Sequence, residues 1–306
     1  MSIRFDGKVA IVTGAGAGLG RCHALGLAAR GAKVMINDIA AVGEVSAAAA
    51  AVVAEIEAAG GEAIAHGANV ADAAQVEDMV AQTMAKWGRV DILINNAGIL
   101  RDKSFAKMTM DDFRLVVDVH LMGAAYCSKA VWNIMREQGY GRIVMTTSSS
   151  GLYGNFGQAN YGAGKMAVVG LMNTLSIEGH KNNIRVNALS PTAATSMTEG
   201  LISEEVFALI TPESVTPAAL FLCSDEAPTK TIVGAGAGSY AVARLYETDG
   251  MYLPEEHQNP EGIAEHWQQL FDNSEQKELS SGWGQTAKFV EKSAAGQGIA
   301  IDLSNV

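Results

Sequence analysis

The chain has 306 residues, of which 48% are apolar and 18% charged, with a formal net charge of −11. This composition excludes an intrinsically disordered chain, and the negative charge argues against nucleic acid as a general partner. No run of about 18 uncharged apolar residues is present, so no membrane association is expected. The first residues lack the apolar core of a signal peptide, and we therefore expect a cytoplasmic protein.

Short apolar runs alternate with longer alanine-rich helical stretches along the first 240 residues. The runs are almost continuously apolar, which is typical of strands covered on both faces. Strand–helix alternation implies right-handed crossovers. We therefore predict an α/β fold, a single-domain doubly wound parallel sheet of the Rossmann type over residues 1–240. Its expected strands are 8–13, 33–37, 63–66, 91–95, 142–146, 185–189 and, more weakly, 231–234.

The alternation stops near residue 240. Turn signals and helical stretches follow without a further sheet pattern. We expect residues 241–306 to form a helical C-terminal extension that packs on the main domain or on a partner subunit.

The turn after the first expected strand is rich in glycine. "KVAIVTG" runs into "AGAGLGRCHALG", where Gly14, Gly18, Leu19 and Gly20 lie at the change from strand to helix. Glycine there permits a tight turn and a close approach of the backbone to a pyrophosphate, and the helix N-terminus supplies free N–H groups. Several glycines can occur in a loop by chance, but this position between strand and helix favours a dinucleotide site.

The second expected strand, "KVMIND", ends at Asp38. A carboxylate at this point can accept hydrogen bonds from the adenosine ribose and repels a 2′-phosphate, which favours NAD over NADP. The alternative is a solvated aspartate at a strand end. Arg21, directly after the glycines, is the one residue that could favour NADP.

The segment "SSSGLYGNFGQANYGAGK" carries the candidate catalytic residues. Tyr161 and Lys165 are four positions apart and share one face of a helix expected to begin near residue 160, while Ser148 follows an expected strand. A phenol is a poor base near neutral pH, and a nearby ammonium and a cationic nicotinamide should both lower its pKa. Ser148 would then hydrogen-bond the substrate oxygen and Tyr161 would exchange the proton. The alternative is a buried tyrosine beside an exposed lysine with no catalytic role. That alternative does not explain why the pair lies at a strand-to-helix crossing downstream of a dinucleotide motif.

Other chemistries find no support in the sequence. "GQANYGAGK" lacks the first glycine and the hydroxyl residue of a phosphate-binding P-loop. Cys22, Cys127 and Cys223 match no metal spacing, and small apolar core residues are expected there. No metal site is therefore predicted.

Together, "TGAGAGLG", "NNAG", Ser148, "YGAGK" and "SPTAATS" resemble the short-chain dehydrogenase/reductase family. The resemblance implies an oxidoreductase that moves a hydride between a nicotinamide cofactor and a secondary alcohol or ketone. It also places His120 where most of the family has the asparagine of a proton relay; the alternative for His120 is a buried histidine with a structural role. The implied cofactor contacts are Asn96, Ala97 and Gly98, with Asn69 and Val70 near the adenine, Tyr161 and Lys165 near the ribose, and Thr195 and Ser196 near the carboxamide.

Longer segments, including "GLYGNFGQANY" and "IEGHKNNIRVNALSP", are similar to the branch of this family formed by the (3R)-hydroxyacyl-CoA dehydrogenase units of peroxisomal multifunctional enzymes type 2. This resemblance implies an NAD-dependent enzyme acting on a (3R)-3-hydroxyacyl-CoA, in a homodimer or homotetramer. The alternatives are a 17β-hydroxysteroid dehydrogenase and a non-catalytic NAD-binding scaffold or sensor. Basic residues for the CoA phosphates would favour the thioester, and the candidates are Arg101, Lys103 and Lys107.

Overall fold

The computed structural model describes residues 2–194 and 203–302. By its internal contacts the chain divides into two compact units, Met1–Ala243 and Arg244–Val306. Among the helices in the described ranges, none combines the length and apolarity needed to cross a membrane.

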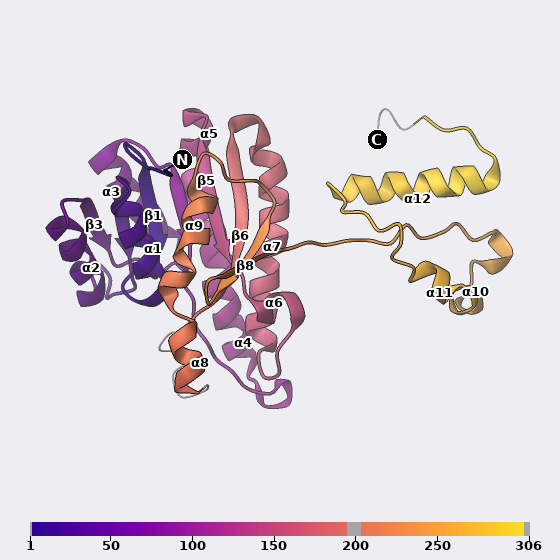
Figure 1. Ribbon diagram of the computed structural model, residues 1–306, viewed down its shortest axis with the longest axis horizontal. Coiled ribbons are helices and arrows are strands. Elements are labelled where there is room, and N and C mark those ends of the chain that lie inside the picture. The colour runs from indigo at the N-terminus through magenta and orange to yellow at the C-terminus, as the bar shows by residue number, and fades with distance from the viewer. Residues whose placement is uncertain (1, 195–202, 303–306) are drawn as a thin grey trace. The chain divides into compact units, whose positions relative to one another are not determined.

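The first unit is built on one eight-stranded sheet with the strand order β3-β2-β1-β4-β5-β6-β7-β8 (Figure 1). The first seven strands are parallel to one another, which confirms the predicted doubly wound sheet. The order reverses between β1 and β4, and ligands of such sheets bind beyond the carboxyl ends of the strands at this switch point. The strands are β1 Val9–Thr13, β2 Lys33–Asn37, β3 Glu62–His66, β4 Ile92–Asn95, β5 Gly141–Thr146, β6 Ile184–Thr192, β7 Ile232–Gly236 and β8 Ser239–Ala243.

The last strand, β8, pairs antiparallel with β7 and was not predicted. Only Ala237 and Gly238 separate the paired residues Gly236 and Ser239, and both turn residues have positive φ angles, of 50° and 70°. This backbone is the geometry of a two-residue hairpin, whose twist matches that of the flanking strands. An alanine in the first turn position is not a usual hairpin signal, which is why the strand was missed.

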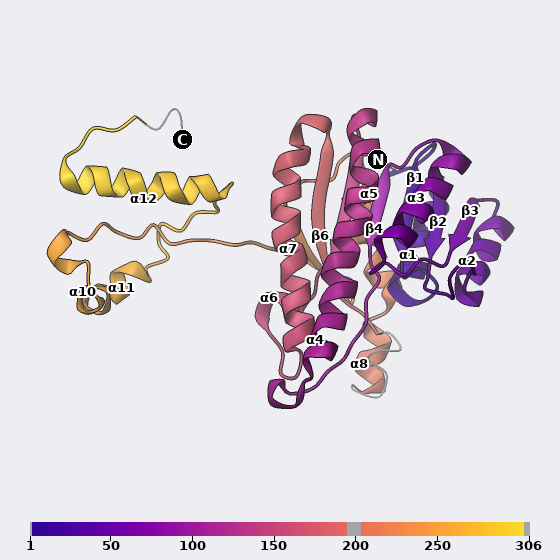
Figure 2. The ribbon, with the colours of Figure 1, turned by 180° about the vertical axis from the view of Figure 1, so that it is seen from behind.

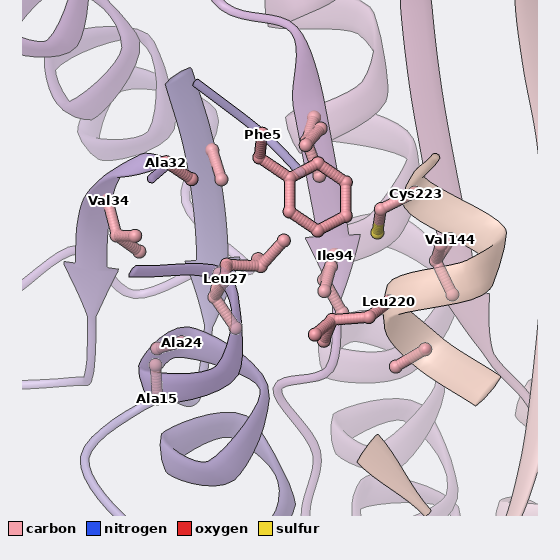
Figure 3. Packing of buried hydrophobic residues seen from close by; sticks show 14 of the residues in the cluster. Phe5, Ala15, Ala24, Leu27, Ala32, Val34, Ile94, Val144, Leu220 and Cys223 are labelled. Atoms are coloured by element: carbon pink, nitrogen blue, oxygen red, sulfur yellow. The ribbon is translucent and has the colours of Figure 1, made fainter. Parts of the chain in front are cut away.

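Helices cover both faces of the sheet. One apolar core joins α1 Gly18–Ala28, α2 Ala47–Ala58 and α9 Thr216–Cys223 to one face, and Figure 3 shows part of it, with Leu27 and Leu220 beside Phe5. A second core joins the other face to α3 Ala73–Trp87, α5 Gly123–Gln138 and α7 Ala159–Gly179; α5 and α7 are prominent in Figure 2. Successive strand residues serve opposite cores, so both faces are apolar and the strands read as continuous apolar runs.

Local signals explain where the flanking helices begin and end. The side chain of Ser46 accepts a hydrogen bond from Ala49 N at the start of α2, and Asp72 accepts from Ala74 N and Gln75 N at the start of α3. Gly88, at φ 71°, ends α3 in the left-handed conformation that glycine adopts without strain. The shorter helices of this unit are α4 Met110–Val117, α6 Ser149–Tyr153 and α8 Glu204–Leu209.

The described part of the second unit, residues 244–302, contains the α-helices α10 Pro260–Glu265, α11 Trp267–Leu270 and α12 Gly282–Gln297. Glu247 exchanges backbone hydrogen bonds with Lys277 and pairs through its carboxylate with Lys288 of α12. Lys292 of α12 pairs with Asp249 at 2.5 Å. These contacts hold α12 against the segment that opens the unit.

Candidate active site

The glycine-rich turn joins β1 to α1. Gly14 and Gly18 have φ angles of 61° and 53°, which side-chain-bearing residues rarely adopt. A Cβ atom on Gly20 would clash with the carbonyl oxygen of Gly14. Gly20 is therefore needed for the close packing of α1 on the turn. Leu19, beside it, is half-buried and packs against the first core.

Asp38, directly after β2, reaches this turn. Its Oδ2 accepts a hydrogen bond from Gly16 N at 2.7 Å, and a Cβ atom on Gly16 would clash with the same carboxylate. Gly16 was not among the predicted site residues. The only signal for it in the sequence is its place between the other glycines. The contact brings Asp38 to the turn from a position 22 residues away in the chain.

Asn96 and Ala97, after β4, are tied to the end of β1. Asn96 Nδ2 donates to the carbonyl oxygens of Thr13 and Gly14 at 2.9 and 3.1 Å. The hydroxyl of Thr13 accepts from Asn96 N and Ala97 N at 3.0 and 3.1 Å. Thr13 was not among the predicted site residues. Its hydrogen bonds join β1 to the residues that follow β4, at the switch point where the sheet order reverses.

His120 is buried beneath the next glycine. It lies in a π-helical turn, Asp118–Met122, and a Cβ atom on Gly98 would clash with its ring. Its Nε2 lies 2.8 Å from Ile99 O and 3.2 Å from Ile99 N. The shorter contact favours Nε2–H as a donor to Ile99 O, which leaves Nδ1 as an acceptor. Burial, reinforced by the charge of Lys165, lowers the pKa of His120 to about 3, so the imidazole is neutral.

Ser148, Tyr161 and Lys165 converge next to His120. Ser148 follows β5 and caps α6, while the other two residues lie one turn apart on α7, which begins at Ala159. The ring of Tyr161 stands edge-on to that of His120, with centroids 5.1 Å apart. Lys165 Nζ lies 5.5 Å from the Tyr161 ring centroid and donates to Thr146 O at 2.7 Å. The Thr147 hydroxyl donates to Lys165 O at 2.6 Å, so two unpredicted threonines hold the lysine.

Burial dominates the electrostatics of Tyr161 and Lys165 in the cofactor-free protein. Burial raises the pKa of Tyr161, opposed by its hydrogen bond with Ser148. Burial also lowers the pKa of Lys165 to about 7. In the free protein, desolvation therefore disfavours the charged form of each residue. The predicted lowering of the tyrosine pKa requires a bound nicotinamide as well as the lysine, and it stays a prediction.

A small polar cavity adjoins the lysine. It has a volume of about 10 Å³, near the minimum for one water molecule, and its lining includes Lys165. Three other lining residues carry buried polar atoms without a protein partner: Asn95 Oδ1, His120 Nδ1 and Thr146 Oγ1. Buried polar groups are normally hydrogen-bonded, so this cavity is suited to a bound water molecule.

The remaining predicted residues fall into two groups. Val70 is buried against Gly123, and Asn69 Oδ1 accepts from Ala71 N at 3.0 Å, so both are fixed in the turn between β3 and α3. Thr195 and Ser196 lie outside the described residues.

The predicted basic candidates are all exposed. Lys103 pairs with Asp112 at 3.0 Å, Arg101 donates to Leu100 O at 2.7 Å, and Lys107 ends a short 3-10 turn.

The chain belongs to the short-chain dehydrogenase/reductase family, since residues 8–205 match the model of the short chain dehydrogenase family. It is therefore an oxidoreductase of this class. It is 48% identical to peroxisomal multifunctional enzyme A of Dictyostelium discoideum, over 89% of this chain and 62% of that protein. The full-length peroxisomal multifunctional enzyme type 2 of Drosophila melanogaster matches 96% of this chain and 50% of that chain in structure, with a TM-score of 0.81 and 38% identity. The predicted resemblance to the multifunctional-enzyme branch is confirmed.

These comparisons also bear on location and cofactor. The expectation of a cytoplasmic location is wrong, because the multifunctional relatives are peroxisomal enzymes. A further structural match, at TM-score 0.70 and 33% identity over 77% of this chain and 95% of that one, is a 7α-hydroxysteroid dehydrogenase complexed with NADH and 7-oxo glycochenodeoxycholic acid. Membership of the family and this neighbour indicate a nicotinamide cofactor. The chain spans about half the length of the multifunctional relatives, between 38% and 62%.

Proposed function

We propose that the protein is an NAD-dependent dehydrogenase that oxidises the secondary alcohol of a (3R)-3-hydroxyacyl-CoA. The observation that carries the reaction type is the convergence of Ser148, Tyr161 and Lys165. Lys165 lines the same small cavity as Thr13, the residue before the glycine-rich turn. The choice of substrate rests on the resemblance to the multifunctional-enzyme branch and on the 48% identity with one such enzyme.

The residues at the turn fit a dinucleotide. Gly14, Gly18 and Gly20 keep side chains away from the N-terminus of α1, where the phosphates would lie. Asp38 would accept hydrogen bonds from the adenosine ribose. Val70, Asn69 and Asn96 would lie along the adenosine side, and Leu19, Ala97 and Gly98 would line the path to the catalytic residues.

The choice of NAD over NADP has support on both sides of the turn. Asp38 is held at the turn by Gly16, where its charge would oppose a 2′-phosphate. Arg21, the residue that could favour NADP, donates to both carboxylate oxygens of Glu55 at 2.8 and 2.6 Å. The guanidinium is therefore already neutralised by the protein.

The catalytic residues would divide the work as follows. Ser148 would donate a hydrogen bond to the substrate oxygen, and Tyr161 would take the hydroxyl proton as the C–H bond breaks. When bound, the nicotinamide ring supplies the hydride acceptor. The ammonium of Lys165, held by Thr146 O, would stabilise the phenolate, since opposite charges offset the desolvation that each suffers alone.

We assign His120 a positioning role. Its neutral ring packs edge-on against Tyr161, and Nδ1 faces the polar cavity that Lys165 also lines. A water molecule bound there would hydrogen-bond to His120 Nδ1 and to the polar groups around the lysine. Protons would pass to and from the lysine through this water, while His120 stays neutral.

The assembly is also a proposal. Apolar side chains are exposed on the helices that flank the site, among them Leu115 of α4 and Met166 and Ile177 of α7, at 41%, 37% and 52%. These helices would pair between subunits of a homodimer or homotetramer, and residues 241–306 would pack on the main domain or on a partner subunit.

The test is NADH formation with a (3R)-3-hydroxyacyl-CoA and a 17β-hydroxysteroid side by side, for wild type and Tyr161→Phe. We expect thioester turnover, reduced about 10²–10⁴-fold in the variant with NADH binding retained, because the base is lost. Turnover of the steroid alone would keep the mechanism and overturn the substrate. Tight NADH binding without turnover of either alcohol would favour the scaffold or sensor.

A further inference from the structure

The second unit contains a cluster of potential metal ligands that the dehydrogenase reaction does not use. His257 ends the 3-10 turn Glu255–His257, Glu265 ends α10, and His266 follows directly. One ligand atom from each of the three lies within 4.8 Å of the others, and no second group of this kind occurs among the described residues. Both imidazoles are partly buried and the carboxylate is exposed.

The ring of His266 is oriented by the backbone of α10. Its Nδ1 lies 2.8 Å from Gly262 O, so Nδ1–H donates to the carbonyl and Nε2 keeps its lone pair. A hydrogen bond from the second ring nitrogen to a backbone carbonyl is the arrangement by which proteins fix metal-binding histidines.

His257 is held in place by the turn that precedes α10. Asn259 accepts from Gly262 N at 2.8 Å and donates to Glu256 O at 2.7 Å. A Cβ atom on Gly262 would clash with the carbonyl oxygen of His257. Gly262 therefore allows the close approach of the His257 backbone to the helix that carries the other two residues.

The spacing and charge suit a small divalent cation. Because no two of the three atoms are more than 4.8 Å apart, some point lies within about 2.8 Å of all of them, and zinc bonds of about 2.0–2.2 Å need only a further small inward movement. The side chain of Glu265 is exposed and can make most of this inward movement. The twelve residues 255–266 contain four glutamates and neither lysine nor arginine, so the local field attracts cations.

We propose that His257, Glu265 and His266 form a binding site for Zn²⁺ in the second unit. Two imidazoles and a carboxylate are ligands that zinc accepts, with water completing a tetrahedral shell. The ion would tie the 3-10 turn to the end of α10 and stabilise this unit. The proposal does not depend on the dehydrogenase function proposed above.

The same geometry has a simpler explanation. The His257 and His266 rings stand edge to face with centroids 5.5 Å apart, and His257 Nδ1 lies 3.9 Å from Glu265 Oε2. Such contacts could hold the turn without an ion. Direct metal binding separates the two explanations.

The experiment uses the full-length protein, stripped with a chelator and titrated with Zn²⁺ by calorimetry, with Co²⁺ absorption as a second readout. We expect one zinc per chain and visible absorption bands of four-coordinate cobalt. His257→Ala, His266→Ala and Glu265→Gln should each weaken zinc binding by at least about tenfold, since each removes one of three protein ligands.

Two matched controls test the assignment. Glu261→Gln changes an exposed carboxylate on the same helix, and His180→Gln changes an exposed histidine in the other unit; both should bind zinc like wild type. Because Glu265 is exposed, Glu265→Gln should fold normally, which circular dichroism without metal would verify. A wild type that binds no zinc, or a Glu265→Gln variant that binds like Glu261→Gln, would overturn the site.

Discussion

The guanidinium of Arg21 on α1 donates to both carboxylate oxygens of Glu55 on α2, at 2.6 and 2.8 Å. Both side chains are partly exposed, at 38% and 47%, so the pair contributes little to stability. The pair matters more for the proposed cofactor site. Arg21 directly follows the glycine-rich turn, and its guanidinium is already hydrogen-bonded to Glu55.

Cofactor choice follows from this pair and from Asp38. Asp38→Asn should reduce the preference for NAD over NADP about tenfold, because one carboxylate no longer opposes the 2′-phosphate. Glu55→Gln should raise kcat/KM for NADP by a smaller factor by freeing Arg21. Glu57→Gln, an exposed change on the same helix, is the control. Steady-state kinetics with both cofactors would check this, and equal ratios in all four proteins would contradict it.

Lys165 should make the stability of the cofactor-free protein depend on pH. Its folded-state pKa is about 7 against an ordinary value of 10.5, so between these values the unfolded chain binds the extra proton. Stability therefore rises with pH across this window, by about 1.4 kcal/mol per unit. Relative to wild type, Lys165→Met should lose this slope, whereas Lys129→Met, at an exposed position, should keep it. Urea unfolding between pH 7.5 and 9.5 measures both.

His120 should also make the stability of the protein rise with pH, in the acid range. Its folded-state pKa of about 3 lies below the ordinary 6.5, so its contribution is fully present above pH 6.5 and is lost as the pH falls toward 3. His120→Asn should reduce the slope of unfolding free energy by about 1.4 kcal/mol per unit between pH 6 and 4. His180→Asn serves as the exposed control. An unchanged slope in His120→Asn would mean that the buried ring titrates normally.

Two glycines offer a matched test of close packing. Gly20→Ala would place a methyl group against Gly14 O, and we expect a loss of about 1–3 kcal/mol together with NADH affinity. Gly170→Ala, on the exposed side of α7 with open space around it, should instead stabilise the protein by up to about 1 kcal/mol. Thermal unfolding and NADH titration of the two variants should give opposite changes; similar changes would show that the turn tolerates a side chain.

Binding of a CoA thioester should depend on the exposed basic residues Arg101 and Lys107. Arg101→Ala and Lys107→Ala are each expected to raise KM for the thioester about threefold to tenfold, the effect of a solvent-exposed charge pair. A pantetheine thioester, which lacks the nucleotide phosphates, should be unaffected, and Lys129→Ala is the surface control. Equal increases in KM for the CoA and pantetheine thioesters would show that Arg101 and Lys107 do not recognise the CoA phosphates.

Much of the fold could be predicted because its signals are local. Strands covered on both faces must be apolar at successive positions, so the seven parallel strands were visible, and each lay within a few residues of its observed bounds. The hairpin strand β8 was missed because its turn depends on a positive φ at Ala237, which the residue type does not indicate. The glycines after β1 and the Ser148, Tyr161 and Lys165 set were predicted from spacing, from their place at the strand ends and from the family resemblance, and their roles stay predictions.

What the sequence determined by itself was the order of the strands and helices and which polar residues follow each strand, since propensity and spacing are properties of neighbours in the chain. Only the tertiary structure decided which groups these residues contact. Gly16 meets Asp38 across 22 residues and Arg21 meets Glu55 across 34. Burial raises the pKa of Tyr161 although a lysine lies one helical turn away. Desolvation and pairing depend on groups brought together by packing, and these distances exist only once the sheet has formed.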